Sequence, residues 1–244
     1  MTVTTSPVTE QVIVYPDSDR QPMADNTLQF RWIVTIQGGF DALFRDRADV
    51  FVAGDLLWYP VEGEPKIRRA PDALIAFGRP KGYRGSYKQW QEDDIPPQVV
   101  FEVLSPGNTA AELIRKWRFY AEYGVEEYYI YDPERGELSG WLRTGPLLAE
   151  IESMEGWVSP RTGVRFGLEG ADLVLLRPDG RRFASYLEVV AAQEAAEHAR
   201  AEAETARDAA EVRAVQAQHE RDAAEARAAR LAERLRALGL DPEA

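Results

Sequence analysis

Short apolar runs alternate with polar turn segments along the chain up to about residue 187. Residues 27–44 carry apolar side chains at mixed spacing and predict a helix, although Gly38 and Gly39 lower its intrinsic propensity. Strands are predicted where short runs are rich in β-branched and aromatic residues, at residues 50–52, 56–59, 73–77 and 99–104. The last of these runs has prolines close to both ends, which gives strong local punctuation.

The most regular helical pattern before the C-terminal region covers residues 109–123. Thr109 is followed three positions later by Glu112 in a capping-box pattern, and Gly124 supplies a C-terminal stop. Another strand is predicted at residues 128–131, closed by an Asp-Pro pair. The order strand, helix, strand with short connections predicts a βαβ unit whose helix packs on a sheet.

Later apolar runs predict hairpins that extend the sheet, at residues 138–142, 147–151, 173–176 and 183–187. Together these elements predict an α/β fold with a mixed central β-sheet flanked by helices. Residues 27–187 would form this domain. Residues 1–26 are rich in Thr, Pro, Asp and Ser and predict a flexible N-terminal arm.

From residue 188 the composition changes abruptly to Ala, Glu and Arg, and Gly and Pro are absent until Gly239. This pattern predicts one long helix within residues 188–244, roughly 75 Å long if it is unbroken up to Gly239. One row repeats at heptad spacing: Ala196, Ala203, Ala210, Ala217, Ala224, Leu231 and Leu238. The companion row is apolar at Ala199 and Ala206 and then becomes charged. A coiled coil and a solvated single helix both remain open, and the coiled coil would help to hold a homo-oligomer such as a dimer.

Composition excludes several kinds of catalytic site. The chain has no cysteine, and its two histidines, His198 and His219, lie in the predicted C-terminal helix. Cys–His and Ser–His nucleophile pairs and zinc sites built on Cys or His are therefore excluded from the body. Carboxylates with water suit hard ions such as Mg²⁺ or Mn²⁺. No apolar run approaches membrane-spanning length, so we expect a soluble, cytoplasmic protein.

The net charge of −12 argues against general affinity for nucleic acid. Residues 191–244 hold 12 acidic and 8 basic residues and contribute −4, so the body carries −8. A local basic stretch with Asp72 as its only acid consists of Lys66, Arg68, Arg69, Arg79, Lys81, Arg84 and Lys88. Tyr83, Tyr87 and Trp90 lie among and just after these cations. A nucleic-acid-facing loop and an ordinary polar loop are equally good interpretations.

Asp72, Glu102 and Lys116 form the candidate catalytic set. Both acids lie at or within apolar runs, where a carboxylate costs free energy unless it is paired or bound to a metal. If the two strands pair, the carboxylates can converge on a divalent ion, and a nearby lysine can orient or deprotonate water or offset charge on a phosphate. Taken alone, Asp72 is also typical of a turn, and Lys116 of a helix lysine that reaches toward solvent.

Neighbouring polar residues have weaker assignments. Asp55 follows Gly54 in another apolar run and is either a third acid of the metal site or the cap of a turn. Tyr120 is interpreted as a core aromatic. Glu126 and Glu127 are expected to decorate the end of a strand.

The longer motifs carry a family resemblance. They are Ala-Pro-Asp at 70–72, Phe-Glu-Val-Leu-Ser-Pro-Gly-Asn at 101–108, then Lys116, Tyr120, Gly-Val-Glu-Glu-Tyr-Tyr at 124–129 and Asp-Pro at 132–133. Over about residues 40–187 the sequence resembles the Uma2 family of the PD-(D/E)XK restriction-endonuclease-like superfamily. The resemblance implies metal ligands at Asp72 and Glu102. Leu104 replaces the usual lysine of the Glu motif, which implies that Lys116 has taken the lysine role. Many relatives also carry an acid on an early Glu-Leu-Ile-type segment, which has no clear counterpart in this sequence.

Two functions follow as expectations. The first is a Mg²⁺- or Mn²⁺-dependent endonuclease that hydrolyses phosphodiester bonds of nucleic acid, with DNA as the expected substrate. The second is a catalytically inactive binding or scaffold protein that keeps the nuclease core and oligomerises through its C-terminal helix. The acidic net charge favours the second function, and the Asp-Glu-Lys set favours the first.

Overall fold

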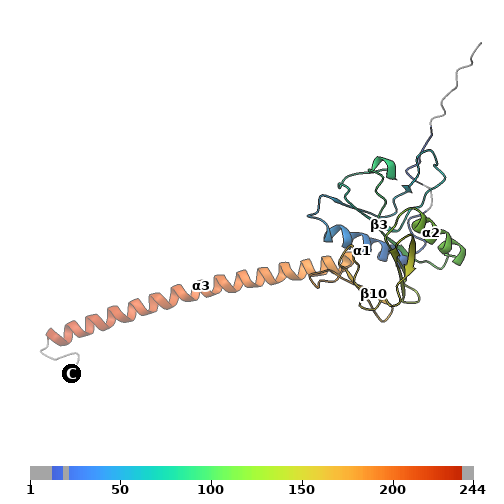
Figure 1. Cartoon of the computed structure of the whole chain (residues 1–244). Coiled ribbons are helices and arrows are strands. Elements are labelled where there is room, and N and C mark those ends of the chain that lie inside the picture. The colour runs from blue at the N-terminus through green and yellow to red at the C-terminus, as the bar shows by residue number, and fades with distance from the viewer. Residues whose placement is uncertain (1–12, 19–21, 238–244) are drawn as a thin grey trace, which may run out of the picture. The chain divides into compact units, whose positions relative to one another are not determined.

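A computed structural model describes residues 13–18 and 22–237 of the chain (Figure 1). The chain divides between Tyr186 and Leu187 into two compact units. Within the described ranges, no helix is both long enough and apolar enough to cross a membrane.

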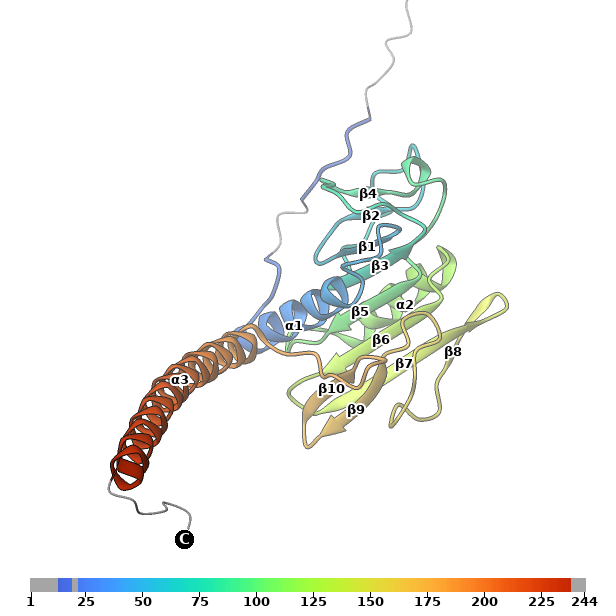
Figure 2. The same cartoon turned by 90° about the vertical axis from the view of Figure 1, so that its left-hand side faces the viewer.

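A six-stranded mixed sheet forms the centre of the first unit. Its strands, in spatial order, are β1 (Val50–Ala53), β3 (Ala73–Phe77), β5 (Val99–Val103), β6 (Glu127–Asp132), β7 (Glu137–Thr144) and β8 (Leu147–Glu150). Figure 2 shows these strands side by side in this order. Neighbours are antiparallel except for β5 and β6, which are parallel. The sheet confirms the predicted α/β class with a mixed central sheet.

Helix α2 (Ala110–Glu122) connects the parallel strands β5 and β6, as the predicted βαβ unit requires. The Thr109 side chain caps the helix by accepting a hydrogen bond from the amide of Glu112 at 3.2 Å. At the other end, the guanidinium of Arg143 on β7 donates to the carbonyl of Ala121 at 2.7 Å. Both ends of α2 are therefore fixed, which sets the positions of the side chains along it.

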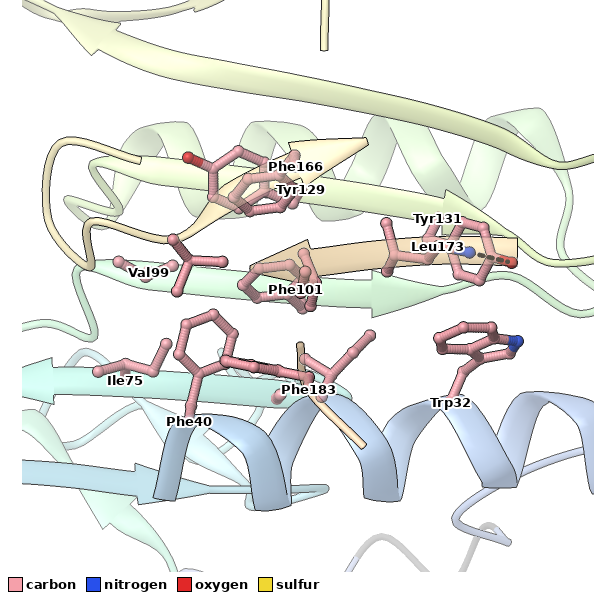
Figure 3. Close-up of a cluster of buried hydrophobic side chains, with 14 of the residues drawn as sticks. Trp32, Phe40, Ile75, Val99, Phe101, Tyr129, Tyr131, Phe166, Leu173 and Phe183 are labelled. Atoms are coloured by element: carbon pink, nitrogen blue, oxygen red, sulfur yellow. Dashed lines mark hydrogen bonds between the residues drawn. The ribbon is translucent and has the colours of Figure 1, made fainter. Parts of the chain in front are cut away.

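The alternation of side chains along β5 separates two cores. Val99, Phe101 and Val103 lie in one apolar cluster, which also contains residues of helix α1 (Thr27–Leu43). Figure 3 shows Phe40 of α1 pointing toward the strands, and its ring lies 5.2 Å from that of Phe101. Even-numbered residues of β5 face the second cluster, which contains residues of α2. Glu102 therefore lies on the α2 side of the sheet.

Helix α1 runs through Gly38 and Gly39 even though each glycine costs about 1 kcal/mol of helix propensity. Gly39 is needed for packing, because a Cβ there would come within 2.1 Å of the Phe183 ring. The close approach of helix and ring buries Phe183 and offsets the weak local propensity.

Two small sheets lie outside the central one. They are the antiparallel pair β9 (Arg165–Glu169) with β10 (Asp172–Leu176), and the parallel pair β2 (Trp58–Tyr59) with β4 (Tyr87–Lys88), followed by the short helix η1 (Gln89–Gln91). The prediction that later hairpins extend the central sheet is right for β7 and β8. It is wrong for β10, whose Leu173 and Leu175 pack into the α1-side core.

The predicted strand at residues 183–187 is also wrong. The amide of Phe183 donates to the carbonyl of Leu175 at 2.8 Å, and a helix begins three residues later at Tyr186. A short apolar run does not by itself distinguish a strand from a single anchoring side chain followed by a helix.

Described residues of the predicted N-terminal arm contact the body. The Tyr15 ring lies 5.3 Å from the ring of Tyr59 and 5.0 Å from that of Trp90. The Tyr59 hydroxyl donates to the carbonyl of Pro16 at 2.6 Å. Residues 1–12 and 19–21 of this arm lie outside the described residues.

The second unit is described as one helix, α3 (Tyr186–Ala237), whose 52 residues begin with the last residue of the first unit. Most of its described side chains are exposed in the single chain, and the heptad row runs along it from Ala196 to Leu231. Leu238, the last member of that row, lies outside the described residues. The single helix agrees with the sequence pattern, and the coiled coil stays a prediction.

Candidate active site

The register of β3 and β5 brings the two predicted carboxylates together. In this antiparallel pair Ala73 lies opposite Phe101, and one step further along the same register Asp72 lies opposite Glu102. Residues opposite each other share a face of the sheet, with Cβ atoms about 4.5–5.5 Å apart. The backbone of β5 holds the Asp72 side chain in place, because Oδ2 of Asp72 accepts a hydrogen bond from the amide of Val103 at 2.6 Å.

Glu102 is buried, with 1% of the residue exposed, and both of its carboxylate oxygens have donors. The Tyr120 hydroxyl donates to Oε1 at 2.5 Å, and Lys116 Nζ donates to Oε2 at 2.8 Å. Lys116 and Tyr120 are four residues apart on α2 and so lie on one face of the helix. This pairing is what allows a carboxylate to remain in an apolar strand.

The electrostatics of the group follow from burial and from its close charges. Burial raises the pKa of Asp72 well above its usual range, and the charge of Glu102 raises it further, whereas Lys116 and the Val103 amide oppose the rise. Burial lowers the pKa of Lys116, but the charges of Glu102 and Asp72 outweigh burial, so this pKa is raised overall. Lys116 therefore stays protonated, and the two carboxylates compete for one cation.

A cleft of about 730 Å³ opens beside this group. Asp72 and Lys116 lie on its wall, and Glu102 lies buried beneath them. The other walls come from residues 22–29 and from the segment between β1 and β3. Of the candidate catalytic set, a ligand in the cleft would therefore meet Asp72 and Lys116 before Glu102.

Asp55 lines the same cleft. It is exposed and follows β1 with φ 47°, in the left-handed region typical of turns. Its amide donates to the carbonyl of Pro71 at 3.1 Å, which holds the turn beside the start of β3. Glycine fits closely at position 54, where a Cβ would lie 3.2 Å from the carbonyl oxygen of Asp72, a tight contact. Asp55 thus both makes the turn and lies in the cleft wall.

The structure divides the predicted basic stretch into two groups. Lys66, Arg68 and Arg69 line the cleft. The other group lies in the loop that leads to β4 and η1 and is tied to nearby acids: Arg79 and Arg84 both pair with Glu92, and Lys81 pairs with Asp41. Lys88 lies with its Nζ 5.6 Å from the centre of the Tyr15 ring. Acids outside residues 66–88, on both sides of the stretch in sequence, pair with Arg79, Lys81 and Arg84, which composition within the stretch could not reveal.

Sequence reasoning missed or discounted several residues of the cleft and the site. Tyr120 is fully buried in the α2-side cluster, which confirms the predicted core aromatic. The contact of its hydroxyl with Glu102 was missed, although its spacing of four from Lys116 was a usable signal. Arg115 lies in the cleft wall next to Lys116. Gln29 on α1 also lines the cleft, and its Nε2 donates to the carbonyl of Val103 at 2.8 Å. No sequence pattern indicated that Gln29 would lie at the site. Its side-chain amide lies where α1 meets the cleft.

Glu127 is the first residue of β6, at the strand end where the sequence predicts it, but it is not a surface residue there. The residue is fully buried. Its carboxylate accepts hydrogen bonds from the Ser159 hydroxyl at 2.5 Å, the Tyr129 hydroxyl at 3.0 Å and the Arg161 amide at 2.7 Å. Burial raises the pKa of Glu127, and these three donors limit the rise.

The oxygen donors for a metal ion are few. Across residues 13–18 and 22–237, no group of three or more His, Cys, Asp or Glu side chains is arranged to hold one. Asp72 and Glu102 are the carboxylates that the sheet places opposite each other. A hard divalent ion at this point would need water or substrate oxygens to complete its coordination.

The fold is that of an α/β protein with a mixed sheet. Comparison with known proteins shows to which family of such proteins the chain belongs. Residues 24–176 match the Uma2 family, described as "Putative restriction endonuclease". This match covers more than half of the 244-residue chain, so the chain belongs to the Uma2 family, which indicates a nuclease.

One solved structure is described as "a putative nuclease belonging to DUF820", from Anabaena variabilis ATCC 29413. It is similar to this chain with a TM-score of 0.42 and 10% sequence identity, over 55% of this chain and 72% of its own. No curated protein matches the sequence.

Proposed function

We propose that this protein is a divalent-metal-dependent endonuclease that hydrolyses phosphodiester bonds of nucleic acid, with DNA as the expected substrate. The observation that carries the proposal is the arrangement of Asp72, Glu102 and Lys116 beside one cleft. The carboxylates are opposed across two strands, and Lys116 Nζ lies 2.8 Å from Glu102. Membership of the Uma2 family supports the nuclease class.

Asp72 and Glu102 would hold the metal ion. The half-buried carboxylate of Asp72 and the buried carboxylate of Glu102 repel each other, and the raised pKa of Asp72, which burial and the Glu102 charge cause, reflects this. A divalent cation would offset that repulsion, and oxygen ligands suit Mg²⁺ or Mn²⁺. Such an ion supplies Lewis-acid activation of a phosphoryl oxygen and of water. Asp55 in the cleft wall is a candidate for a further oxygen ligand.

Lys116 would act as a cation and not as a base. Its pKa is raised overall by the neighbouring carboxylates, so it holds its proton at neutral pH. An ammonium on the cleft wall can donate to a phosphate oxygen where negative charge develops. Tyr120, which donates to the other oxygen of Glu102, would keep that carboxylate in one orientation.

The proposal is tested by metal binding and cleavage in the same proteins. Wild type with Mn²⁺ should cleave supercoiled plasmid and melt at a higher temperature than without the ion, because a ligand that binds the folded state stabilises it. Asp72→Asn/Glu102→Gln should lose both effects. Glu127→Gln is the matched control, since it neutralises another buried glutamate away from the cleft. An equal Mn²⁺ shift in wild type and in the double variant would refute the metal site.

A second candidate is a non-catalytic binding or scaffold protein with a nuclease core. It is favoured by the ion pair between Lys116 and Glu102, which satisfies the buried carboxylate without a metal, and by the net charge of −12. This function requires that calorimetry with Mn²⁺ gives no binding heat and that plasmid stays intact.

We propose in addition that α3 helps copies of the chain to associate through its heptad row. Alanines bury little area each, so the contribution of the helix should be modest. In the full-length chain, Ala203→Glu/Ala224→Glu should lower the association constant in sedimentation. Ala201→Glu/Ala229→Glu adds the same charge elsewhere on the helix and should not. Equal behaviour of the two variants would remove the coiled coil and leave a solvated helix.

A further inference from the structure

A second, smaller hollow of about 280 Å³ adjoins the candidate active site. Its basic lining residues are Lys66, Arg68, Arg69, Arg115 and Arg118. All of these except Arg118 also line the larger cleft, so the two hollows adjoin each other. We call this set of five cations and the hollow between them the basic groove.

The cations of the basic groove are not neutralised by the protein. Within the described part of the chain, none of the five makes an ion pair with a carboxylate within 4.0 Å. Arg79 and Arg84, by contrast, share the carboxylate of Glu92. Glu122 is the acid in the lining of the groove itself. The groove therefore carries a local excess of positive charge on a chain whose net charge is −12.

The groove is also held in place by structure. The backbone of Arg69 pairs with Trp58, with its carbonyl accepting from the Trp58 amide at 2.7 Å. The Arg69 guanidinium lies 5.5 Å from the centre of the Phe119 ring. On α2, Arg115 and Arg118 are three residues apart and lie on neighbouring positions of one helix face. The groove thus has one wall from the segment before β3 and another from α2.

We infer that the basic groove binds the phosphodiester backbone of the substrate next to the phosphate that is cleaved. The inference rests on the proposed function and names the surface through which that site would hold nucleic acid. Unneutralised Lys and Arg side chains contact phosphates, and such contacts position a strand without reading its bases. An acidic protein needs such a local surface, because its overall field repels a polyanion.

The test measures binding of a labelled duplex oligonucleotide to the full-length protein in EDTA, over a series of salt concentrations. The groove variant is Lys66→Gln/Arg115→Gln/Arg118→Gln. Log affinity falls with log salt concentration, and each phosphate contact adds about 0.9 to the steepness of this fall. With three contacts removed, the fall should be less steep in the groove variant by about 2 to 3. Its affinity near 0.1 M salt should fall at least tenfold, and by the same factor for unrelated sequences.

A control variant removes equal charge from exposed positions outside the groove: Arg45→Gln/Arg135→Gln/Arg181→Gln. It should bind within about twofold of wild type, since distant surface charges are screened beyond the Debye length of roughly 10 Å. Arg115→Lys/Arg118→Lys keeps the charge and should retain the wild-type slope. Melting curves of all variants should coincide, because the substituted side chains are exposed, and coincidence rules out unfolding as the cause of lost binding.

The groove and the proposed function fail in different ways. Equal binding by the groove variant and the control variant, in a protein that cleaves plasmid with Mn²⁺, would overturn the groove and leave the endonuclease in place. Loss of binding confined to the groove variant, in a protein that never cleaves, would support the groove and reject the endonuclease. Failure of wild type to bind the duplex even at low salt would overturn the groove.

Discussion

Glu102 and Glu127 are buried glutamates on neighbouring parallel strands, and their surroundings differ in kind. Glu102 is 1% exposed near the carboxyl end of β5, and Glu127 is 0% exposed at the amino end of β6. Glu102 accepts from an ammonium and a tyrosine hydroxyl and faces a second carboxylate. Glu127 accepts from two neutral hydroxyls and a backbone amide.

The difference shows that burial of a carboxylate does not by itself mark a functional site. Glu127 joins the sheet to the turn that contains Ser159 and Arg161, and its donors are neutral groups that cost little to hold in place. Glu102 instead belongs to a charged group with Asp72 and Lys116, which border a large cleft. Close like charges, a cation and access to a cavity are the features that distinguish a candidate active site.

The largest expected effect comes from removing the cation of the Glu102 group. Lys116→Ala should lower kcat for plasmid cleavage by about 10²- to 10³-fold, because one donor to developing charge is lost. Binding of Mn²⁺ measured by calorimetry should remain, since the ammonium is not a metal ligand. Lys116→Arg should restore the activity only in part, because a guanidinium has a different shape and hydrogen-bonding geometry. Unchanged cleavage by Lys116→Ala would remove the lysine from the site.

Glu127→Ala should change stability and leave chemistry intact. The substitution leaves the Ser159 hydroxyl, the Tyr129 hydroxyl and the Arg161 amide without their acceptor, which should cost about 2–4 kcal/mol of unfolding free energy. Urea denaturation measures this loss. The cleavage rate per folded molecule should stay within about twofold of wild type. A large loss of cleavage rate with an unchanged urea midpoint would give Glu127 a functional role and contradict its assignment as a structural glutamate.

A smaller effect should follow from Tyr120→Phe, which removes the donor to Oε1 of Glu102 while keeping the ring. We expect a loss of about 1–2 kcal/mol in unfolding free energy and about a tenfold lower kcat with little change in KM. Tyr128→Phe is the matched control, because the Tyr128 hydroxyl is buried and has no hydrogen-bond partner among the described residues. That control should be neutral or slightly stabilising. Similar losses in both variants would mean that Tyr120 acts through packing alone.

The smallest expected effect is on the pH dependence of stability. Burial raises the folded-state pKa of Glu127 above its ordinary value of about 4.3. Its contribution to stability is therefore complete below the ordinary pKa and is lost as pH rises through the raised one. In Glu127→Gln the neutral amide cannot titrate. The free energy of unfolding should therefore fall less between mildly acidic and neutral pH than it does in wild type. Urea unfolding across this range measures the difference, and parallel curves would contradict it.

Much of the fold was readable from the sequence because its signals are local. The capping residue Thr109, the helix it begins and the strand on each side of that helix were all predicted. The strand at 173–176 was placed in the wrong sheet and the segment 183–187 is not a strand, because an apolar run shows that a segment is buried but not which structure or sheet it joins. Gly39 has a low helix propensity, yet a glycine is needed at this position of the helix because the Phe183 ring packs against it.

The sequence by itself determined the long C-terminal helix, the α/β order of elements and the choice of Asp72, Glu102 and Lys116 as candidates. Residue type and spacing act over a few positions, so these features can be read along the chain. The tertiary structure decided which charges are neutralised. It paired Arg79 and Arg84 with Glu92, left the basic groove unpaired, and buried Glu127 among neutral donors. Charge and hydrogen-bond partners depend on distance in space, and the pairing of strands far apart in sequence sets that distance.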